Sequence, residues 1–287
     1  MHSHSSTQRF NTCPYAYKLS KLDGLVRTAY QLESNDREWA IAGHRGLHAY
    51  YTGGNPVAAF SAAYPTDLDP IEKVWTREGG IRTLEAYAER YDLARDQWDI
   101  LEAELDNRVE GEDEASEGHV IIDLVTRHRS SGSVYFWDHK FKHKLNQFTG
   151  RQYELDSQLS RYASYVQTKY GECAGAIVNI ICPGYRQRAY KGEPAGWHFR
   201  FEQNVYNRSK DQIEVWRREQ AVWEAAIEQC QRVGHFPRHY GWQCGRCEFY
   251  DVCFAEREGG DSSSVRDAMY GGLQSGQDMS IEIEEAV

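Results

Sequence analysis

The spacing of apolar residues alternates along the chain between helical periodicity and short β-rich runs, which predicts a mixed α/β fold. Apolar residues recur every three or four positions in four stretches that we expect to be helical: 39–51, 76–91, 154–168 and 209–230. Runs rich in β-branched and aromatic residues predict five strands: 100–105, 120–125, 134–140, 174–181 and 197–205. Residues 58–70 show neither pattern, so we expect an irregular connection there.

The predicted helices carry local signals at their ends and along their buried faces. Ser209 and Gln212 form a capping box, and Gly234 follows the last apolar position of that helix. The helix over 154–168 has an apolar stripe. We expect its four members to be buried: Leu155, Leu159, Tyr162 and Val166.

A predicted hairpin over 120–140 carries charged residues in otherwise apolar runs. Its two strands flank the turn Ser130-Ser131-Gly132-Ser133. Asp123 interrupts the first strand, and the second strand ends in Asp138-His139-Lys140. Because a buried carboxylate without a partner is costly, these acids indicate either a metal site or a simple Asp–Lys ion pair.

Composition is that of a globular protein with a substantial core. The 287 residues are 40% hydrophobic and 13% aromatic. No apolar run reaches the length of a membrane helix, and the first residues lack the apolar centre of a signal peptide. We therefore expect a cytoplasmic protein, in which cysteine patterns indicate metal binding or catalysis rather than disulfides.

The net charge of −10 is unevenly distributed along the chain. Residues 259–287 contain six acids and one base, and we expect this acidic stretch to be a disordered tail. Bases gather directly after the hairpin: Lys140, Lys142, Lys144 and Arg151. This cluster predicts either a solvated loop or, beside a phosphodiesterase site, a track for a nucleic-acid backbone.

Four of the seven cysteines form a pattern that suits a metal centre. The other three fall within strand or helix patterns and are expected in the core: Cys173, Cys182 and Cys230. The run 244–253 has the spacing C-x2-C-x5-C, and Cys13 is the free candidate for a fourth ligand. Thiolates favour zinc or an iron–sulfur cluster, but this spacing lacks the two close pairs of a zinc ribbon.

His44 and His48 lie four residues apart and so share one face of a predicted helix. That spacing is compatible with metal binding, although hydrogen-bonded histidines with no metal are commoner. On the pattern alone, both interpretations stay open.

In their order along the chain, these motifs resemble the PD-(D/E)XK nucleases of the RecB-like group, from about Phe10 to Cys253. The similarity is to iron–sulfur members, namely the AddB nuclease domain and the small exonucleases of CRISPR adaptation. It implies a restriction-endonuclease-like core, in which helices flank a central mixed β-sheet. It also implies a single nuclease domain over 1–258 and an iron–sulfur clasp that joins the N- and C-terminal segments.

The resemblance implies specific roles for residues of this chain. Cluster ligands of a 4Fe–4S centre would be Cys13, Cys244, Cys247 and Cys253. Ligands of Mg²⁺ or Mn²⁺ would be His48, Asp123, Asp138 and the backbone carbonyl of His139. Lys140 would orient the attacking water, and the Q-x3-Y motif would supply Gln158 to position it and Tyr162 to contact the substrate.

Two departures from the family pattern affect these assignments. His44 stands where the family usually has a small residue, and Gly118 lies earlier than the expected glycine before Asp123. An acid before the hairpin, Glu102 or Glu104, is a further candidate.

The implied function is a metal-dependent exonuclease that acts on single-stranded DNA or DNA ends. The implied partners are DNA and proteins of recombination, repair or CRISPR adaptation, and the chain could form a homo-oligomer. Two alternatives from other classes are a non-catalytic DNA-end-binding subunit with the same fold and a zinc-stapled structural protein.

Overall fold

The computed structural model describes residues 4–27, 35–64, 73–103, 120–189, 191–192 and 194–272, and these divide into two compact units. We call the first the sheet unit: it holds the described residues from 35 to 103 and from 120 to 216. The second, the cysteine unit, holds those from 4 to 27 and from 217 to 272. Among the described residues, no helix has the length and apolarity to cross a membrane.

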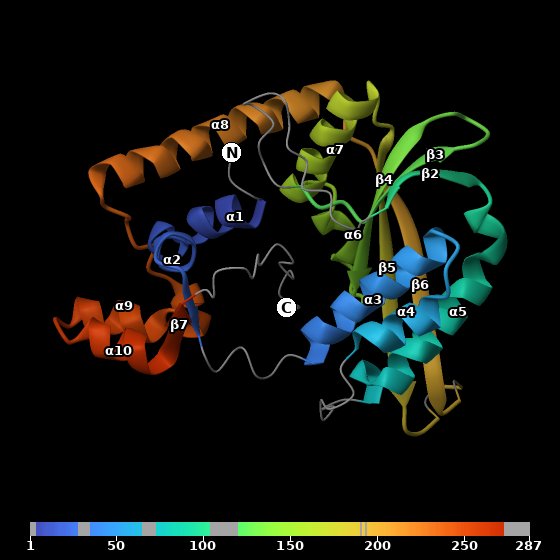
Figure 1. The fold of residues 1–287 in the computed structure, drawn as a ribbon, viewed down its shortest axis with the longest axis horizontal. Helices are drawn as coiled ribbons and strands as arrows, with labels where there is room; N and C mark the ends of the chain where they lie inside the picture. Colours follow the sequence, from blue (N-terminus) through green and yellow to red (C-terminus); the bar gives the residue numbers. More distant parts are fainter. Residues whose placement is uncertain are drawn as a thin grey trace. The chain divides into compact units, whose positions relative to one another are not determined.

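Within its described residues, the sheet unit is built on a five-stranded mixed sheet in the order β2-β3-β4-β5-β6 (Figure 1). The strands are β2 (Trp98–Ala103), β3 (Leu124–His128), β4 (Val134–Phe141), β5 (Gly175–Arg186) and β6 (Gly196–Tyr206). β4 and β5 run parallel, whereas the other neighbouring strands are antiparallel. The predicted mixed α/β class, with a central mixed sheet and flanking helices, is confirmed.

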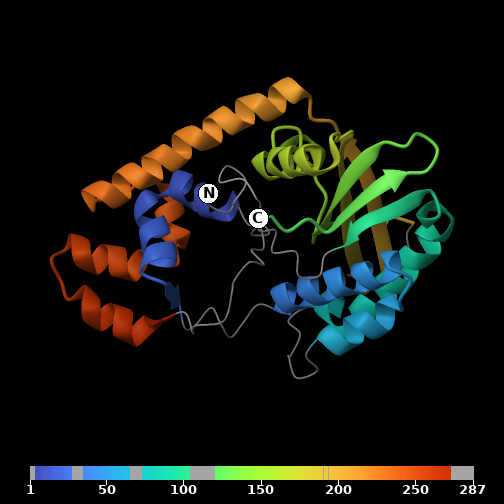
Figure 2. The same ribbon diagram turned by 45° about the horizontal axis from the view of Figure 1, so that its top comes forward.

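Helices cover both faces of this sheet (Figure 2). One face carries α3 (Asn35–Tyr51), α4 (Pro56–Ala63), η3 (Lys73–Trp75) and α5 (Arg77–Arg95), and the other carries α6 (Thr149–Gln152) and α7 (Ser157–Tyr170). Alternate residues of β4 enter the two cores, since Trp137 packs with the α3–α5 layer and Phe136 packs with α7.

Capping residues define where several helices begin. The side chain of Thr76 accepts a hydrogen bond from the Gly79 N–H at the start of α5. At the start of α7, the side chain of Asp156 accepts bonds from the N–H groups of Gln158 and Leu159. The expected capping box of α8 (Lys210–Val233) is present, with reciprocal bonds between Ser209 and Gln212.

Three local expectations were wrong. Residues 58–63, expected to begin an irregular connection, belong to a helix over 56–63, because Asn55 caps this helix and Pro56 occupies its first position. Residues 65–70 of the expected connection lie outside the described residues. Leu155 is 90% exposed, because capping by Asp156 starts α7 at Ser157 and leaves Leu155 outside the apolar stripe. β3 begins at Leu124, so Asp123 precedes the strand instead of lying within it.

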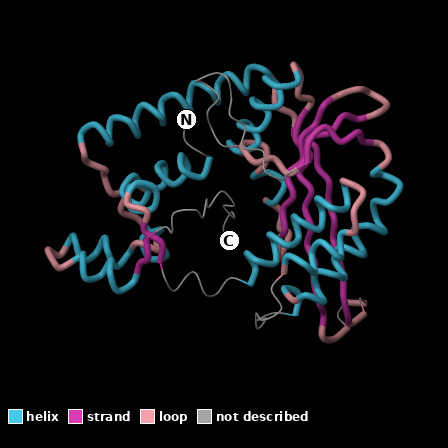
Figure 3. The backbone as a smooth tube through the Cα atoms, in the orientation of Figure 1, coloured by secondary structure: helices cyan, strands magenta, loops and turns pink. Residues whose placement is uncertain are grey.

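The cysteine unit is mostly helical (Figure 3). Its elements are α1 (His4–Thr12), α2 (Pro14–Tyr17), the π-helical turn η1 (Lys18–Leu22), β1 (Leu25–Arg27), the part of α8 from 217, η4 (Trp242–Arg246), α9 (Tyr250–Arg257), α10 (Ser262–Met269) and β7 (Tyr270–Gly272). β1 and β7 pair antiparallel, and the core includes Phe10, Ile227 and Phe249.

The stretch from 259 that we expected to be a disordered tail contains regular structure in its described part. α10 is capped by Asp261, and Arg266 on this helix pairs with Asp23 at 3.1 Å. Residues 273–287 lie outside the described part of the chain, so the boundary of a tail stays a prediction.

Candidate functional site

Asp138 and Lys140 share one face of β4, as the alternation of side chains along a strand requires. Both are largely buried, and Lys140 Nζ lies 3.2 Å from Asp138 Oδ2. The face that they occupy is the one covered by α7, since Phe136, two residues earlier, packs against Tyr162. A cation and a carboxylate are therefore held side by side beneath this helix.

The helix α7 brings two further predicted residues to Lys140. Its Nζ donates a hydrogen bond to Gln158 Oε1 at 3.0 Å, and Gln158 Nε2 donates in turn to the Tyr162 hydroxyl at 3.2 Å. Burial raises the pKa of Tyr162 well above its usual range, and the negative charge of Asp138 raises it further. Tyr162 is therefore a neutral hydroxyl at ordinary pH and can donate a hydrogen bond.

Asp123 is joined to β4 through the backbone of His139. The His139 N–H donates to Asp123 Oδ2 at 2.5 Å, and Asp123 Oδ1 lies 3.0 Å from His44 Nδ1. Burial acts to raise the pKa of this carboxyl, but the charge of His44 and the hydrogen bonds from His44 and His139 outweigh burial and hold the pKa well below its usual range. The side chain is thus ionised in the fold.

The structure brings His44 to Asp123, whereas the family resemblance implies His48 as the metal ligand. Within the described residues, His48 Nδ1 is buried and has no hydrogen-bond partner. Burial and the charge of Arg45 lower the pKa of His48, so its imidazole is neutral. The two histidines therefore differ in their surroundings, although they are four residues apart on α3.

Gly43 permits the approach that places His44. A Cβ at position 43 would lie 2.5 Å from the Phe141 ring, far closer than side-chain contacts allow. The His44 and Phe141 rings meet edge to face, with centroids 5.5 Å apart. A small residue in α3 is therefore needed one position before His44, because the helix packs directly onto the end of β4.

These side chains fit a hard divalent cation that keeps part of its water shell. Within the described part of the chain, no three His, Cys, Asp or Glu side chains form a complete metal-ligand set. Mg²⁺ is usually held by one or two carboxylates, with waters and phosphate oxygens filling the other positions. Asp123 and Asp138 supply two such carboxylates on adjoining segments, so a complete protein cage is not required.

Of the two candidate acids before the hairpin, Glu102 is described and is held by residues at the end of α7. Glu102 pairs with Lys169 Nζ at 2.6 Å and accepts a hydrogen bond from the Tyr170 hydroxyl, at the C-terminal end of α7. Glu104 lies outside the described residues.

The bases after the hairpin have different degrees of exposure. Lys144 and Arg151 are exposed, whereas Lys142 is half-buried and donates its backbone N–H to the Ile181 carbonyl at 3.0 Å. His143 between the lysines accepts a hydrogen bond from Trp75 Nε1 at 3.0 Å. The segment is therefore anchored at its centre and presents cationic side chains to solvent.

The four patterned cysteines all belong to the cysteine unit. Cys13 directly precedes α2, and Cys13, Cys247 and Cys253 pack against one hydrophobic core. Burial raises the pKa of Cys247, and the charges of Cys13 and Cys244 raise it further. Among the described residues, which include all four cysteines, no three such side chains are grouped as ligands of one metal ion. All four are free thiols in the structure.

The other three cysteines lie elsewhere in the fold. Cys173 and Cys182 belong to the sheet unit, and burial raises the pKa of Cys173 to about 11. Cys230 lies on α8 and packs against the core of the cysteine unit. All three are free thiols in partly buried positions.

Sequence reasoning missed a buried polar group behind Asp138 and Lys140. Asn179 interrupts the otherwise apolar strand β5, and its side chain contacts His139 and Tyr87. The sequence signal for this group is a single asparagine in an otherwise apolar strand, because a buried amide needs hydrogen-bond partners.

A comparison with protein families gives one match. The profile of the PD-(D/E)XK nuclease superfamily matches residues 2–254, which is most of the chain and includes every site residue discussed above. A comparison with curated proteins finds no match.

Proposed function

Because the chain belongs to the PD-(D/E)XK nuclease superfamily, we propose that it is a metal-dependent DNA nuclease that acts as an exonuclease on single-stranded DNA or DNA ends. The observation that carries this proposal is the buried arrangement of Asp138, Lys140 and Gln158, with Asp123 joined to the same strand. Such a group of acids and one lysine suits phosphodiester hydrolysis, which needs charge neutralisation and a positioned water.

The divalent ion, Mg²⁺ or Mn²⁺, would be held by Asp123, Asp138 and the backbone carbonyl of His139, together with a histidine of α3. When bound, the ion supplies Lewis acidity at a phosphate oxygen and lowers the pKa of a bound water. His48 is the histidine that the family resemblance implies, but the contact with Asp123 supports His44.

Lys140 acts on the attacking water and on the charge that develops at phosphorus. Its ammonium group is oriented by Gln158 on one side and by Asp138 on the other. An ammonium held in this way can donate to a water and to a non-bridging phosphate oxygen without further rearrangement. Tyr162, kept neutral by burial, accepts a hydrogen bond from Gln158 Nε2 and can donate its own hydroxyl hydrogen to the substrate backbone.

The exposed bases that follow β4 support a track for the DNA backbone. Lys144 and Arg151 are available to phosphates, and the Trp75–His143 hydrogen bond anchors the chain directly before Lys144. Several such contacts make binding salt-dependent, because each neutralised phosphate releases counterions.

A 4Fe–4S cluster on Cys13, Cys244, Cys247 and Cys253 is part of this proposal. Its ligands come from opposite ends of the sequence but lie in one unit, where Arg9 pairs with Glu248 and Arg27 pairs with Asp251. The cluster would join segments that already contact each other, which supports a stabilising role rather than a role in hydrolysis.

The wider assignments rest on the family resemblance. We propose a cytoplasmic protein that processes DNA in recombination, repair or CRISPR adaptation, with possible self-association. A non-catalytic DNA-end binder is the second candidate. Such a protein would not need Asp123, Asp138 and Lys140, all of which this chain has. A zinc-stapled structural protein is the third candidate, and the metal content separates it from the other two.

The decisive experiment is a cleavage assay on protein purified without oxygen. End-labelled linear and circular single strands, and a linear duplex, are incubated with Mg²⁺, Mn²⁺ or EDTA. We expect stepwise shortening of the linear single strand with either metal, an intact circle and no reaction in EDTA. Cleavage of the circular strand would show an endonuclease rather than an exonuclease. No cleavage of any substrate under any condition would refute the proposed function.

A further inference from the structure

The imidazole of His139 is buried on the face of β4 opposite Asp138 and Lys140. Only 4% of the residue is exposed, and the ring stacks on Tyr51 of α3 with a centroid distance of 5.7 Å and an interplanar angle of 9°. On the neighbouring parallel strand, Asn179 stands directly across from His139 in the register. The ring is thus enclosed between a helix and a strand.

Asn179 uses both hydrogens of its amide nitrogen in this enclosure. Its Nδ2 lies 2.9 Å from His139 Nδ1 and 2.9 Å from the Tyr87 hydroxyl oxygen, and Asn179 is fully buried. Because an amide nitrogen can only donate, His139 Nδ1 must accept and carries no proton. The hydrogen-bond pattern therefore selects the neutral tautomer of His139 with its proton on Nε2.

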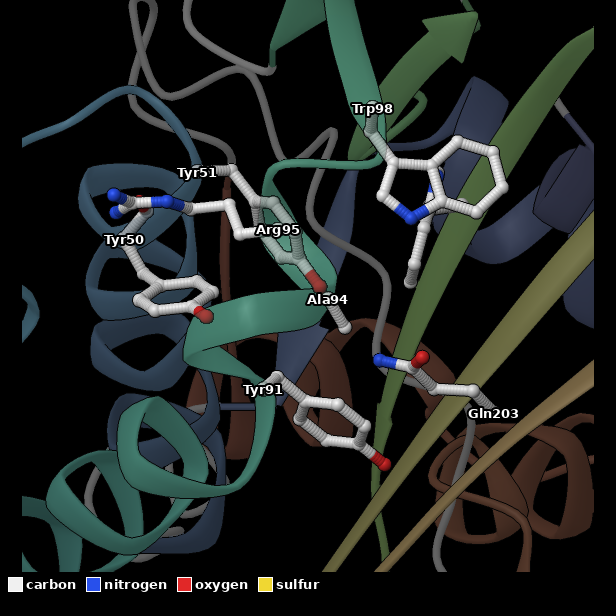
Figure 4. Close-up of a pocket in the computed structure, with 8 residues that line it drawn as sticks. Tyr50, Tyr51, Tyr91, Ala94, Arg95, Trp98 and Gln203 are labelled. Atoms are coloured by element: carbon white, nitrogen blue, oxygen red, sulfur yellow. The ribbon is translucent and has the colours of Figure 1, made fainter. Parts of the chain in front are cut away.

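Tyr87 connects this pair to residues of two other elements. Its hydroxyl lies 2.7 Å from the Tyr51 hydroxyl and accepts a hydrogen bond from Gln203 Nε2 at 3.3 Å. Tyr51 and Gln203 also line a small pocket formed by α3, α5 and three strands (Figure 4). The network thus links α3, α5, β5 and β6 to the central residue of the Asp-x-Lys motif.

His139 transmits this constraint to the opposite face of the sheet through its backbone. The same residue whose ring is held by Asn179 donates its N–H to Asp123 Oδ2, and its neighbours on either side are Asp138 and Lys140. A rotation of the ring would be coupled to the backbone that sets the spacing of these three side chains. A buried polar network with every member bonded restricts such rotations.

We propose that Asn179 is a positioning residue of the active site: its amide fixes the tautomer and orientation of His139, and thereby the Asp123 carboxylate that the His139 N–H holds. The inference rests on the proposed nuclease function in assigning Asp123 to the metal. It assigns no contact between Asn179 and the substrate. The residue acts only through His139.

The test compares Asn179→Ala and Tyr87→Phe with the control Thr126→Val. Thr126 is equally buried, and its hydroxyl accepts a hydrogen bond from Trp137 Nε1 at 2.9 Å. The Trp137 ring lies 6.3 Å from the His139 ring, so the control removes a buried hydrogen bond close to His139 that is not a bond to it. Three quantities are measured for each variant: the ¹⁵N chemical shifts of the His139 ring, the affinity for Mn²⁺ in the absence of DNA, and thermal unfolding.

We expect Asn179→Ala to lose the pure Nε2–H signature of His139 and to bind Mn²⁺ about tenfold more weakly, as for other residues that orient metal ligands. Tyr87→Phe is the milder change and should alter the His139 ring shifts and weaken Mn²⁺ binding to a smaller extent. Thr126→Val should lower the melting temperature but leave the His139 ring shifts and the Mn²⁺ affinity unchanged. The tyrosine variant also decides the matter if the alanine variant does not fold.

An unaltered tautomer together with Mn²⁺ affinity within twofold of the wild type would overturn the inference. So would an equal loss of Mn²⁺ affinity in Thr126→Val, because the effect would then be general destabilisation. The tautomer is read without metal or DNA. A wild-type protein that fails to cleave DNA would therefore contradict the proposed function. The role of Asn179 would still be decided by the tautomer of His139.

Discussion

The Nδ1 atom of His44 lies 3.0 Å from Oδ1 of Asp123, which joins helix α3 to the segment that precedes β3. The contact has the length of a hydrogen bond from the imidazole to the carboxylate, and this bond helps to hold the pKa of Asp123 well below its usual range. Helix α3 therefore contributes His44 to the candidate site.

Replacing the two histidines of α3 separates their roles. We expect His44→Ala to raise the Mg²⁺ concentration needed for half-maximal cleavage by about tenfold or more, since a ligand beside Asp123 is lost. His48→Ala should change this concentration less, because the contact with Asp123 is made by His44. Metal titrations of the cleavage rate measure both. A larger effect in His48→Ala would favour the histidine that the family resemblance implies.

Removing either central charged residue should abolish cleavage but preserve the fold. Asp138→Asn and Lys140→Ala are each expected to lower the rate at saturating metal by at least about 100-fold, as for lost electrostatic stabilisation in other enzymes. Lys210→Ala, a change at an exposed lysine at the start of α8 and outside the proposed DNA track, is the matched control for loss of positive charge. Cleavage by Asp138→Asn at the wild-type rate would refute the catalytic assignment.

The two leucines near the start of α7 should differ sharply in their contribution to stability. Leu159 is fully buried and Leu155 is 90% exposed. We expect Leu159→Ala to lower the free energy of unfolding by about 2–5 kcal/mol, which is the usual cost of such a cavity. Leu155→Ala should change it by less than about 0.5 kcal/mol. Urea denaturation followed by circular dichroism measures both values, and comparable losses would contradict the observed start of the helix.

Loss of one patterned cysteine should remove iron and destabilise the cysteine unit. For Cys253→Ser we expect little bound iron or acid-labile sulfide and a lower melting temperature, because a cluster ligand that joins distant segments is absent. Cys230→Ser is the control, since Cys230 packs against the same core but lies outside the C-x2-C-x5-C run. Iron content and melting are measured on protein purified anaerobically. Unchanged values in Cys253→Ser would rule out a cluster at this position.

The carboxylate of Glu256 should make the cysteine unit sensitive to acid. It accepts a hydrogen bond from Tyr15 and pairs with Arg238 and Arg266. Burial acts to raise the pKa of Glu256, but the Tyr15 hydroxyl and the two arginines outweigh burial, so the folded pKa lies below the ordinary value. A carboxyl with a lowered folded pKa adds stability at neutral pH, and this stability is lost as the pH falls below about 4.5.

Glu256→Gln should therefore lower the free energy of unfolding by about 1–3 kcal/mol at pH 7 and by less at pH 3.5. Chemical denaturation at the two pH values provides the comparison. The control is Glu258→Gln, at the exposed end of α9. A loss of unfolding free energy in Glu256→Gln that is larger at pH 3.5 than at pH 7 would contradict a lowered pKa of Glu256 in the folded protein.

Long periodic segments could be predicted from the sequence because many positions agree in each of them. The helices around Trp39, Thr83 and Leu159 and the strand around Asp138 all have apolar faces that the structure buries. The helix over 56–63 was missed because its small apolar residues show no contrast between faces. Its signal is the Asn55 cap followed by Pro56.

The pairing of side chains within the site was less accessible to sequence reasoning. The choice between His44 and His48 depends on how α3 rotates against β4, which Gly43 and Phe141 decide by close packing. Asn179 could not be assigned a partner, because its contact with His139 follows from the parallel register of two strands. Such relationships come from tertiary geometry and have no local pattern.

The parallel pairing of β4 with β5 orders the events by which the chain folds. Antiparallel strands joined by a short turn, such as β3 and β4, close within about 1–10 μs, whereas a parallel partner requires a long crossover. Asp123 and His139 lie on the two sides of that turn, but Lys140 meets Gln158 only after α6 and α7 have crossed over the sheet. During synthesis, we therefore expect Asp123 to meet the His139 N–H before Lys140 meets Gln158. Cleavage activity should appear late, when the crossover has docked and β5 has joined the sheet.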